Sequence, residues 1–182
     1  MAIITSSRLK ALTEDKIGSR MFAEAVTDAK QESSSRAEVS IFLSHSHNDL
    51  DKVETQRVIV LLRRAGVRVY IDSLDSTLPP FTNAETARKI KAQIKSNKKF
   101  VLVATNTAIR SKWCNWELGF GDAQKYMDHI ALIPIADTAS TWEGNEYLKI
   151  YPRIEETNQV SEWIRVIFPD GKERTLVDWL RS

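Results

Sequence analysis

The sequence predicts an α/β fold built on a doubly wound, mainly parallel sheet. Four short apolar runs rich in β-branched residues begin at Val39, Val67, Phe100 and Ile130, at intervals of about 30 residues, which is close to the length of a strand–helix–strand unit. The runs alternate only weakly between apolar and polar residues. This is typical of parallel strands that helices cover on both faces.

The segment before these runs is predicted to be a helical extension followed by a linker, spanning residues 1–36. Apolar side chains recur at helical spacing over residues 1–30, and no proline interrupts them. Short polar residues over 31–36 offer nothing to bury and indicate the linker. The apolar residues are Leu9, Leu12, Phe22, Ala25, Val26 and Ala29.

Helices fit the three gaps between the runs. Asn48 or Asp49 can cap the first helix, and Gly66 lies where a glycine ends it. Thr82–Glu85 has the spacing of a capping box ahead of the second helix, and Ser111 can cap the third. Right-handed crossovers then favour a flavodoxin-like strand order, with ligands at the carboxyl ends of the strands.

We assign residues 37–136 to the core of the domain and residues 137–182 to its C-terminal completion. The second part is harder to interpret, since turns at Pro152 and Pro169–Gly171 interrupt it. Residues 175–181 are predicted to form a closing helix. Its inward-facing side chains would be Leu176, Trp179 and Leu180.

Composition argues for a cytoplasmic globular protein. The chain of 182 residues is 42% hydrophobic and has a net charge of only +2, which gives little reason to expect a nucleic-acid or membrane partner. Its one cysteine, Cys114, can form neither an internal disulfide nor a cysteine-based zinc site. No secretory signal or membrane-spanning run is present in the sequence.

Several kinds of site can be excluded. The first run ends in Ser44-His45 and the third in Thr105-Asn106, so the acidic residues of a phosphate-accepting receiver domain are missing. No glycine-rich phosphate loop occurs, and no G-x-S-x-G nucleophile motif.

Three further features have ordinary structural explanations that we prefer. His45 and His47 lack a third donor for a metal ion, and Cys114 near a helix start has no base beside it. Residues 88–99 hold six basic side chains, which we interpret as the solvated face of a helix and its exit loop. The alternative is a surface for a phosphate group or an acidic partner.

The segment 111–118, S-K-W-C-N-W-E-L, is the most informative in the chain. On a helix Trp113 and Glu117 are four residues apart and share a face, which sets a carboxylate beside an aromatic ring. We expect the apolar stripe of this helix to face the sheet, with Glu117 at its edge and Leu118 on the opposite, separately covered side. An ordinary surface glutamate beside a packing tryptophan is the alternative. The stripe comprises Trp116, Phe120, Ala123 and Met127.

Taken together, the segments 39–45, 66–72, 85–94 and 111–118 resemble the Toll/interleukin-1 receptor (TIR) domain family, particularly its bacterial members. The resemblance spans roughly residues 38–136, and its strongest part is the S-x-W-C-x-x-E-L signature at 111–118. It implies a flavodoxin-like TIR fold. The loop 72–82 departs from the family pattern because it carries two prolines and lacks a glycine often found there.

The resemblance also implies a site and an activity. Glu117 corresponds to the catalytic residue of TIR domains that consume NAD, in which NAD is a substrate rather than a cofactor and no metal takes part. The substrate-binding positions would be Phe42, Ser44, His45, Asp72 and Trp113.

Cleavage of the nicotinamide–ribose bond passes through an oxocarbenium-like state, which one carboxylate can stabilise. The product would be ADP-ribose, a cyclic isomer or a conjugate. In bacterial antiphage defence systems such as Thoeris, this product would signal to a separate effector protein.

Two other functions stay open. A non-catalytic module that works by TIR self-association would use Leu118 and the segment 1–30. A nucleoside deoxyribosyltransferase also combines a doubly wound sheet with a glutamate at a glycosidic bond.

Overall fold

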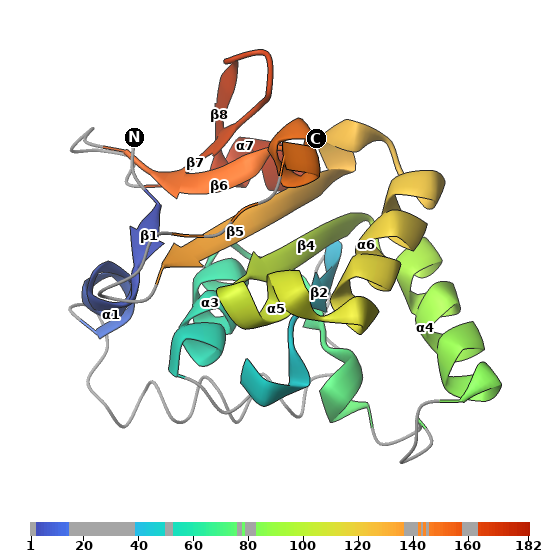
Figure 1. Cartoon of the computed structure of the whole chain (residues 1–182). Helices are drawn as coiled ribbons and strands as arrows, with labels where there is room; N and C mark the ends of the chain where they lie inside the picture. The colour runs from blue at the N-terminus through green and yellow to red at the C-terminus, as the bar shows by residue number, and fades with distance from the viewer. Residues whose placement is uncertain are drawn as a thin grey trace.

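Eight strands form one mixed sheet in the part of the chain that the computed structural model describes (Figure 1). They are β1 (Ile4–Thr5), β2 (Ser40–Ser44), β3 (Arg68–Tyr70), β4 (Lys99–Ala104), β5 (Ile130–Ala136), β6 (Arg153–Glu156), β7 (Ile164–Ile167) and β8 (Glu173–Thr175). Their order is β3-β2-β4-β5-β6-β7-β8, and β1 pairs with β5. The described residues are 3–14, 39–49, 53–75, 78, 83–136, 142, 144, 146–157 and 164–182.

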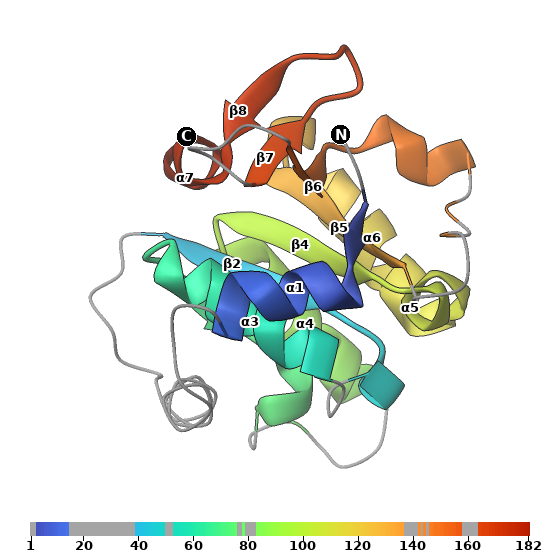
Figure 2. The same ribbon diagram turned by 90° about the vertical axis from the view of Figure 1, so that its left-hand side faces the viewer.

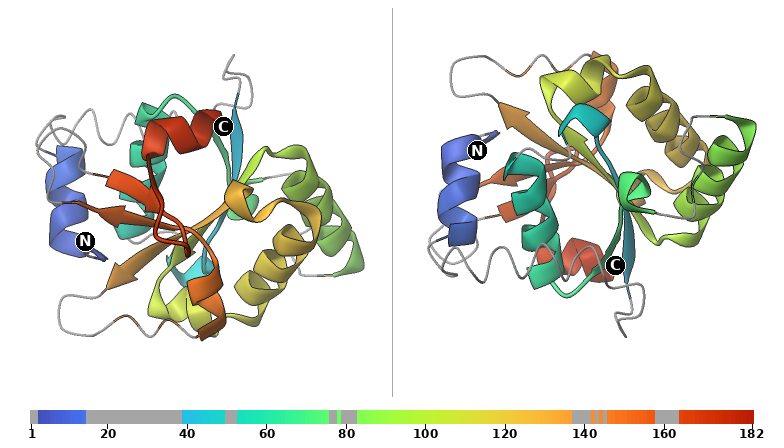
Figure 3. Two further views of the ribbon diagram at one scale, coloured as in Figure 1. Left: turned by 90° about the horizontal axis from the view of Figure 1, so that it is seen from above. Right: turned by 90° about the horizontal axis from the view of Figure 1, so that it is seen from below.

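Helices cover both faces of this sheet (Figure 2, Figure 3). They are α1 (Ser6–Glu14), α3 (Val53–Arg64), α4 (Ala84–Ser96), α5 (Asn106–Arg110), α6 (Lys112–Gln124) and α7 (Leu176–Arg181). Short 3₁₀ helices lie at His47–Asp49, Asp72–Leu74, Met127–His129 and Glu146–Ile150. Helices α1, α3 and α7 pack on one face, and α4, α5 and α6 pack on the other. Among the described residues no helix is long and apolar enough to cross a membrane.

Each central strand contributes to both layers. In β2, Ile41 and Leu43 belong to the core under α3, whereas Phe42 belongs to the core under α4 and α6. In β4, Val101 belongs to the core under α3, and Leu102 belongs to the core under α4 and α6. Because successive side chains on a strand point to opposite faces, a strand buried on both sides must be apolar throughout. The weak alternation noted in the sequence has this cause.

The predicted fold class is confirmed. All four predicted runs are strands, and β3, β2, β4 and β5 pair in parallel as neighbours. Gly66 ends α3 with a φ of +83°, a left-handed conformation that favours glycine. The predicted closing helix is α7, in which Leu176, Trp179 and Leu180 are buried.

The ends of the chain differ from expectation. Residues 4–5 form a strand within the segment predicted to be helical, and α1 follows directly. Strand β1 pairs in parallel with the end of β5, and Ile4 and Leu9 are fully buried. Residues 15–38, which hold the rest of that predicted helix and the predicted linker, lie outside the described residues. The tail adds the antiparallel strands β7 and β8, which the sequence did not predict as a pair.

Candidate functional site

The candidate site lies at the carboxyl ends of β2 and β3, where α6 passes over the sheet. Ser44 ends β2, and His45 follows it. Asp72 and Ser73 lie in the short 3₁₀ helix just after β3. Because β2 and β3 are parallel neighbours, their two exit loops lie at the same edge of the sheet.

Glu117 of α6 reaches this edge from a distant part of the chain. The Ser44 hydroxyl donates a hydrogen bond of 2.5 Å to its Oε2 atom, and the residue is only 1% exposed. The other carboxyl oxygen, Oε1, is buried and has no hydrogen-bond partner among the described residues. Most buried carboxylate oxygens in proteins are hydrogen-bonded, so Oε1 is set to receive a donor from a ligand.

The protein surroundings of Glu117 favour its neutral form. Burial, and then the nearby charge of Asp72, raise the pKa of Glu117 to about 8. The Ser44 hydroxyl and the Trp113 side chain lower this pKa and offset part of the effect. A carboxyl group with a strongly perturbed pKa in such a place is a candidate functional group.

Local interactions fix where α6 begins. The Ser111 hydroxyl accepts a hydrogen bond of 3.3 Å from the Cys114 amide, which confirms the predicted helix cap. The Asn115 side chain donates to the carbonyl of Ile109 at 2.9 Å and so ties the first turn of α6 to α5. These contacts set the position of Glu117, which lies in the second turn.

The predicted orientation of α6 is wrong. Cys114, Glu117, Leu118 and Gly121 are the buried residues of the helix, and Leu118 is 1% exposed. A Cβ atom added to Gly121 would lie 3.1 Å from the ring of Phe100, so the helix approaches the sheet closely there. Glu117 therefore points into the molecule rather than lying at the edge of a core stripe.

The residues predicted to face the sheet lie elsewhere. Trp116 and Phe120 are partly buried, and Lys91 of α4 places its ammonium group 5.5 Å and 5.2 Å from the centres of their rings. Ala123 and Met127 are exposed. The aromatic pair thus packs toward α4, which is the second covered side of the helix.

Trp113 lies next to the site and extends the aromatic packing. Its ring stacks on Trp116 with a centroid distance of 4.7 Å, and the side chain is partly buried. One turn of helix separates Trp113 from Glu117, so the indole borders the carboxyl group as the sequence predicted. A partly exposed ring at this place can shield a bound group from water.

Two histidines flank Asp72, whose side chain is 4% exposed. His45 Nδ1 lies 4.0 Å from Asp72 Oδ1, and His47 Nε2 lies 3.6 Å from Asp72 Oδ2. The His45 ring is fully buried, whereas the His47 side chain is 58% exposed. Burial lowers the pKa of His45, and Asp72 offsets part of that change. The described residues hold no cluster of three or more metal-binding side chains.

Phe42 differs from the other predicted binding residues because it lies inside the core. It is fully buried, and its ring stacks between Tyr70 at 5.6 Å and Phe100 at 5.5 Å. It lies two residues before Ser44 on the same face of β2, so it supports the strand beneath the site. The structure thus brings Ser44, Glu117 and Trp113 together, with His45 and Asp72 beside them.

A model of the TIR domain family matches residues 41–164 of the chain. The matched range is more than half of the sequence and contains Ser44, Asp72 and Glu117. The chain belongs to the TIR domain family. The resemblance found in the sequence is confirmed by this match and by a relative from Bacillus cereus (strain MSX-D12), described as a probable 3' cyclic ADP-D-ribose synthase ThsB'. That protein is 25% identical over 149 residues, which cover 78% of this chain and 75% of the relative.

Cys114 of this TIR domain is a packing residue. It is 1% exposed, and burial raises the pKa of its thiol to about 12, so the reactive thiolate is not formed near neutral pH. This agrees with the preferred interpretation from the sequence.

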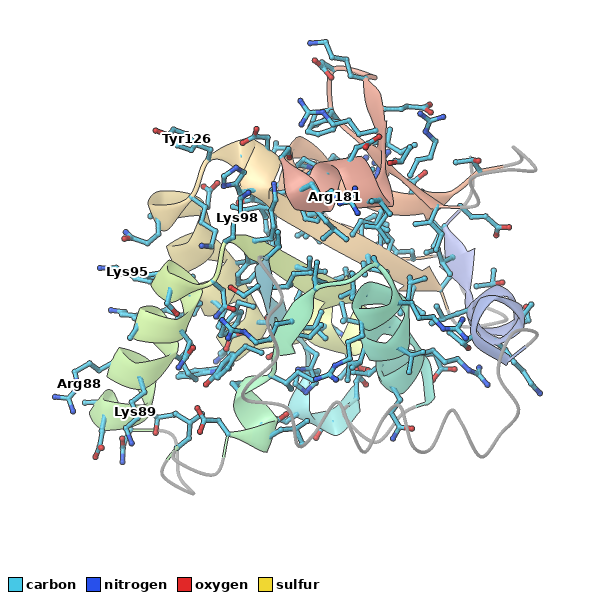
Figure 4. All side chains as sticks on the ribbon, turned by 180° about the vertical axis from the view of Figure 1, so that it is seen from behind. Arg88, Lys89, Lys95, Lys98, Tyr126 and Arg181 are labelled. Atoms are coloured by element: carbon cyan, nitrogen blue, oxygen red, sulfur yellow. The ribbon has the colours of Figure 1, made fainter. Side chains whose placement is uncertain are left out.

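The basic segment 88–99 is mostly a solvated helix face, as predicted. Figure 4 shows Arg88, Lys89 and Lys95 along the outer side of α4, and Lys89 pairs with Glu85 at 3.4 Å. Lys99 is different because it is fully buried, with its ammonium group 4.8 Å from the ring centre of Trp179. It supports the packing of α7 rather than a charged surface.

The sequence analysis missed two neighbours of the TIR site. The Ser73 hydroxyl lies 3.1 Å from His45 Nε2. The Trp142 indole donates a 2.7 Å hydrogen bond to the carbonyl of Ala104, at the carboxyl end of β4. A serine directly after a strand and an isolated tryptophan in a polar segment match no motif, so no sequence signal distinguishes them.

Proposed function

We propose that this TIR domain cleaves the bond between nicotinamide and ribose in NAD, with Glu117 as the catalytic residue. The observation that carries the proposal is the buried carboxyl group whose Oε2 is held by Ser44 while Oε1 has no partner in the described residues. Leaving a buried acceptor unpaired costs about 1–3 kcal/mol. A ribose hydroxyl is a donor that would remove this cost.

The chemistry requires little more than this carboxylate. As the bond breaks, nicotinamide leaves as a neutral molecule, so no acid has to protonate it. Positive charge moves from the nicotinamide ring to the ribose, which becomes oxocarbenium-like. A fixed carboxylate in a place with little water stabilises that charge more strongly than solvent does.

The protonation of Glu117 links substrate binding to catalysis. Its pKa of about 8 keeps much of the carboxyl group neutral at pH 7. The nicotinamide ring of NAD is cationic, and a positive charge nearby favours the charged carboxylate. Binding of NAD is therefore expected to release a proton and to produce the form of Glu117 that acts on the ribose.

The other site residues have supporting roles in this proposal. Ser44 orients the carboxyl group through its hydrogen bond, and Trp113 stacks against the bound rings and excludes water. His45 and Asp72 lie on the loop side of the site, and Phe42 holds β2 in place from the core.

The name of the Bacillus relative supports a cyclic ADP-ribose isomer as the product, with ADP-ribose and an ADP-ribose conjugate as alternatives. Such a product would act as a signal to a separate effector protein in antiphage defence. Self-association through TIR surfaces is compatible with this activity.

A purely non-catalytic scaffold is the alternative from another functional class. Leu118 does not support a scaffold, because its side chain is buried against the sheet and is not available to a partner protein. A scaffold would also have no use for a buried carboxyl group, which is costly to maintain.

The test is to incubate the purified protein at high concentration with NAD and to analyse nicotinamide and the second product by chromatography and mass spectrometry. A product without added water indicates cyclisation, and one with added water indicates hydrolysis. Extract from phage-infected cells serves as a possible trigger. Exchange of nucleobases on deoxynucleosides would instead identify a deoxyribosyltransferase. If no nicotinamide is released with or without the extract, the enzyme proposal is rejected and the scaffold stands.

A further inference from the structure

The loops after β2 and β3 hold a second set of interacting groups beside Glu117. His45 lies between Asp72 and Ser73, with its Nδ1 atom 4.0 Å from the Asp72 carboxylate and its Nε2 atom 3.1 Å from the Ser73 hydroxyl. The His45 ring is fully buried, and Asp72 is 4% exposed. The three groups thus lie in the order carboxylate, imidazole and hydroxyl, with the carboxylate close to Nδ1 but beyond hydrogen-bond distance.

The chemistry of the two partners selects one tautomer of His45. The charge of the Asp72 carboxylate favours the tautomer with the hydrogen on Nδ1, the ring atom nearest to it, although Nδ1 makes no hydrogen bond within the described residues. Nε2 then has a free lone pair and accepts the hydrogen of the Ser73 hydroxyl. Burial lowers the pKa of His45, which keeps the ring neutral and able to take a proton. The charged groups that act on the ring are Asp72, His47 and Asp49.

This proton acceptor shares a neighbour, Asp72, with the carboxyl group that would hold the ribose. His45 directly follows Ser44, whose hydroxyl is 2.5 Å from Glu117. Asp72 is near enough to Glu117 for its charge to raise the pKa of that carboxyl group. One side of the site therefore carries a carboxylate for the ribosyl cation, and the adjoining loop carries a base.

We propose that His45 is the general base that takes the proton from the hydroxyl group attacking the ribosyl carbon, with Asp72 as a positioning residue. The inference rests on the proposed cleavage of NAD and extends it to the second half of the reaction. It assigns the acceptor as an oxygen, in water or in a hydroxyl of the same molecule. A ring nitrogen attacks with a free lone pair and needs no base.

The step balances in atoms and charge. The bond from the ribosyl carbon to nicotinamide breaks, and its electron pair leaves with nicotinamide. The acceptor oxygen forms the new bond to that carbon, and its proton moves to His45 Nε2 and then to water. NAD thus gives nicotinamide, an O-linked ADP-ribose product and one proton. The Ser73 hydroxyl lies 3.1 Å from Nε2, and the acceptor hydroxyl would take over this place.

Azide provides the test, because it attacks the ribosyl carbon without losing a proton. Wild type, His45→Gln and the matched control His47→Gln are incubated with NAD, with and without sodium azide, and nicotinamide and all products are measured by mass. His45→Gln should lose at least about a hundredfold in O-linked product, the lower end of the usual contribution of general-base catalysis. Azide should restore nicotinamide release by this variant and yield ADP-ribosyl azide. His47→Gln should respond to azide as wild type does.

A second variant guards against a folding defect. Asp72→Asn removes the group that selects the tautomer, and it should also divert product to azide. Circular dichroism and thermal melting establish that each variant is folded. Folded His45→Gln and Asp72→Asn could instead form as much O-linked product as wild type, with no added response to azide. In that case His45 is not the general base, while the cleavage of NAD stands. If wild type releases no nicotinamide at all, both proposals are rejected.

Discussion

Glu117 combines two properties that rarely occur together in a folded protein. It is almost fully buried, yet one of its carboxyl oxygens has no partner among the described residues. Burial and the charge of Asp72 raise its pKa to about 8, and the Ser44 and Trp113 side chains offset only part of that change. Such a group lowers the stability of the protein and is expected to gain partners when substrate binds.

Replacing Glu117 with glutamine should stabilise the fold, and more at pH 8 than at pH 5. Between the ordinary pKa of 4.5 and the folded-state pKa of about 8, the folded protein binds more protons than the unfolded chain. The free energy of unfolding of wild type therefore falls as the pH rises through this range. A neutral amide avoids the loss, which is about 3–4 kcal/mol between pH 5 and pH 8. Urea denaturation at both pH values measures it, with exposed Glu85→Gln as the control. An equal gain at both pH values would contradict this prediction.

The pH dependence of nicotinamide release should report the same carboxyl group. If the charged form of Glu117 is active, kcat/KM rises with pH and levels off above its pKa of about 8. Ser44→Ala removes a hydrogen bond that lowers this pKa, so the rise should move to higher pH. Asp72→Asn removes a charge that raises it, so the rise should move to lower pH. The measurement is kcat/KM for wild type and both variants from pH 6 to pH 10. If the two variants shift the rise in the same direction, Glu117 is not the group that titrates.

At the scale of elements, α6 positions the site because it is buried on two sides. Leu118 and Gly121 face the sheet, and Trp116 and Phe120 pack toward α4. The apolar pattern of the sequence shows that such a helix is covered, but it does not show which covered side meets the sheet. Gly121 adds no apolar signal, although it allows the closest approach to Phe100. The predicted orientation of α6 was wrong because the apolar pattern favoured the side that packs toward α4.

Two glycines of α6 provide a matched pair. A Cβ atom at Gly119 would meet nothing within 4 Å, so Gly119→Ala should raise the free energy of unfolding by about 1 kcal/mol through helix propensity. A Cβ atom at Gly121 would lie 3.1 Å from the fully buried ring of Phe100. Gly121→Ala should therefore be less stable than Gly119→Ala by at least about 1 kcal/mol. Urea denaturation of the two variants measures the difference, and equal stabilities would show that α6 is not held against the sheet as described.

At the scale of the whole molecule, much of the TIR fold could be predicted from the sequence and part of it could not. The apolar runs predicted the parallel strands because the central strands β2, β4 and β5 are buried on both faces. Strand β1 has only two residues, too few to show a period, and its partner β5 is far away in the chain. Contacts between distant parts of the chain are also what the sequence did not show at the site. The motif around Glu117 identified the residue, whereas its contact with Ser44 joins positions 73 residues apart.

The N-terminal segment should contribute to the stability of the whole domain. Leu9 of α1 is fully buried in the same core cluster as residues of α3 and β5. Leu9→Ala should lower the free energy of unfolding by about 2–5 kcal/mol, the usual cost of truncating a buried leucine. Exposed Val177→Ala should change it by no more than about 0.5 kcal/mol. Urea denaturation tests this, and a small effect of Leu9→Ala would show that the segment contributes little.

The central claim is that the buried carboxyl group of Glu117 cleaves NAD. The most direct measurement is the rate of nicotinamide release by wild type, Glu117→Gln and the exposed control Glu85→Gln, each shown to be folded. We predict that Glu117→Gln loses at least about a hundredfold in rate, as when one transition-state contact is removed, and that Glu85→Gln keeps the wild-type rate. Equal rates for Glu117→Gln and wild type would contradict the account.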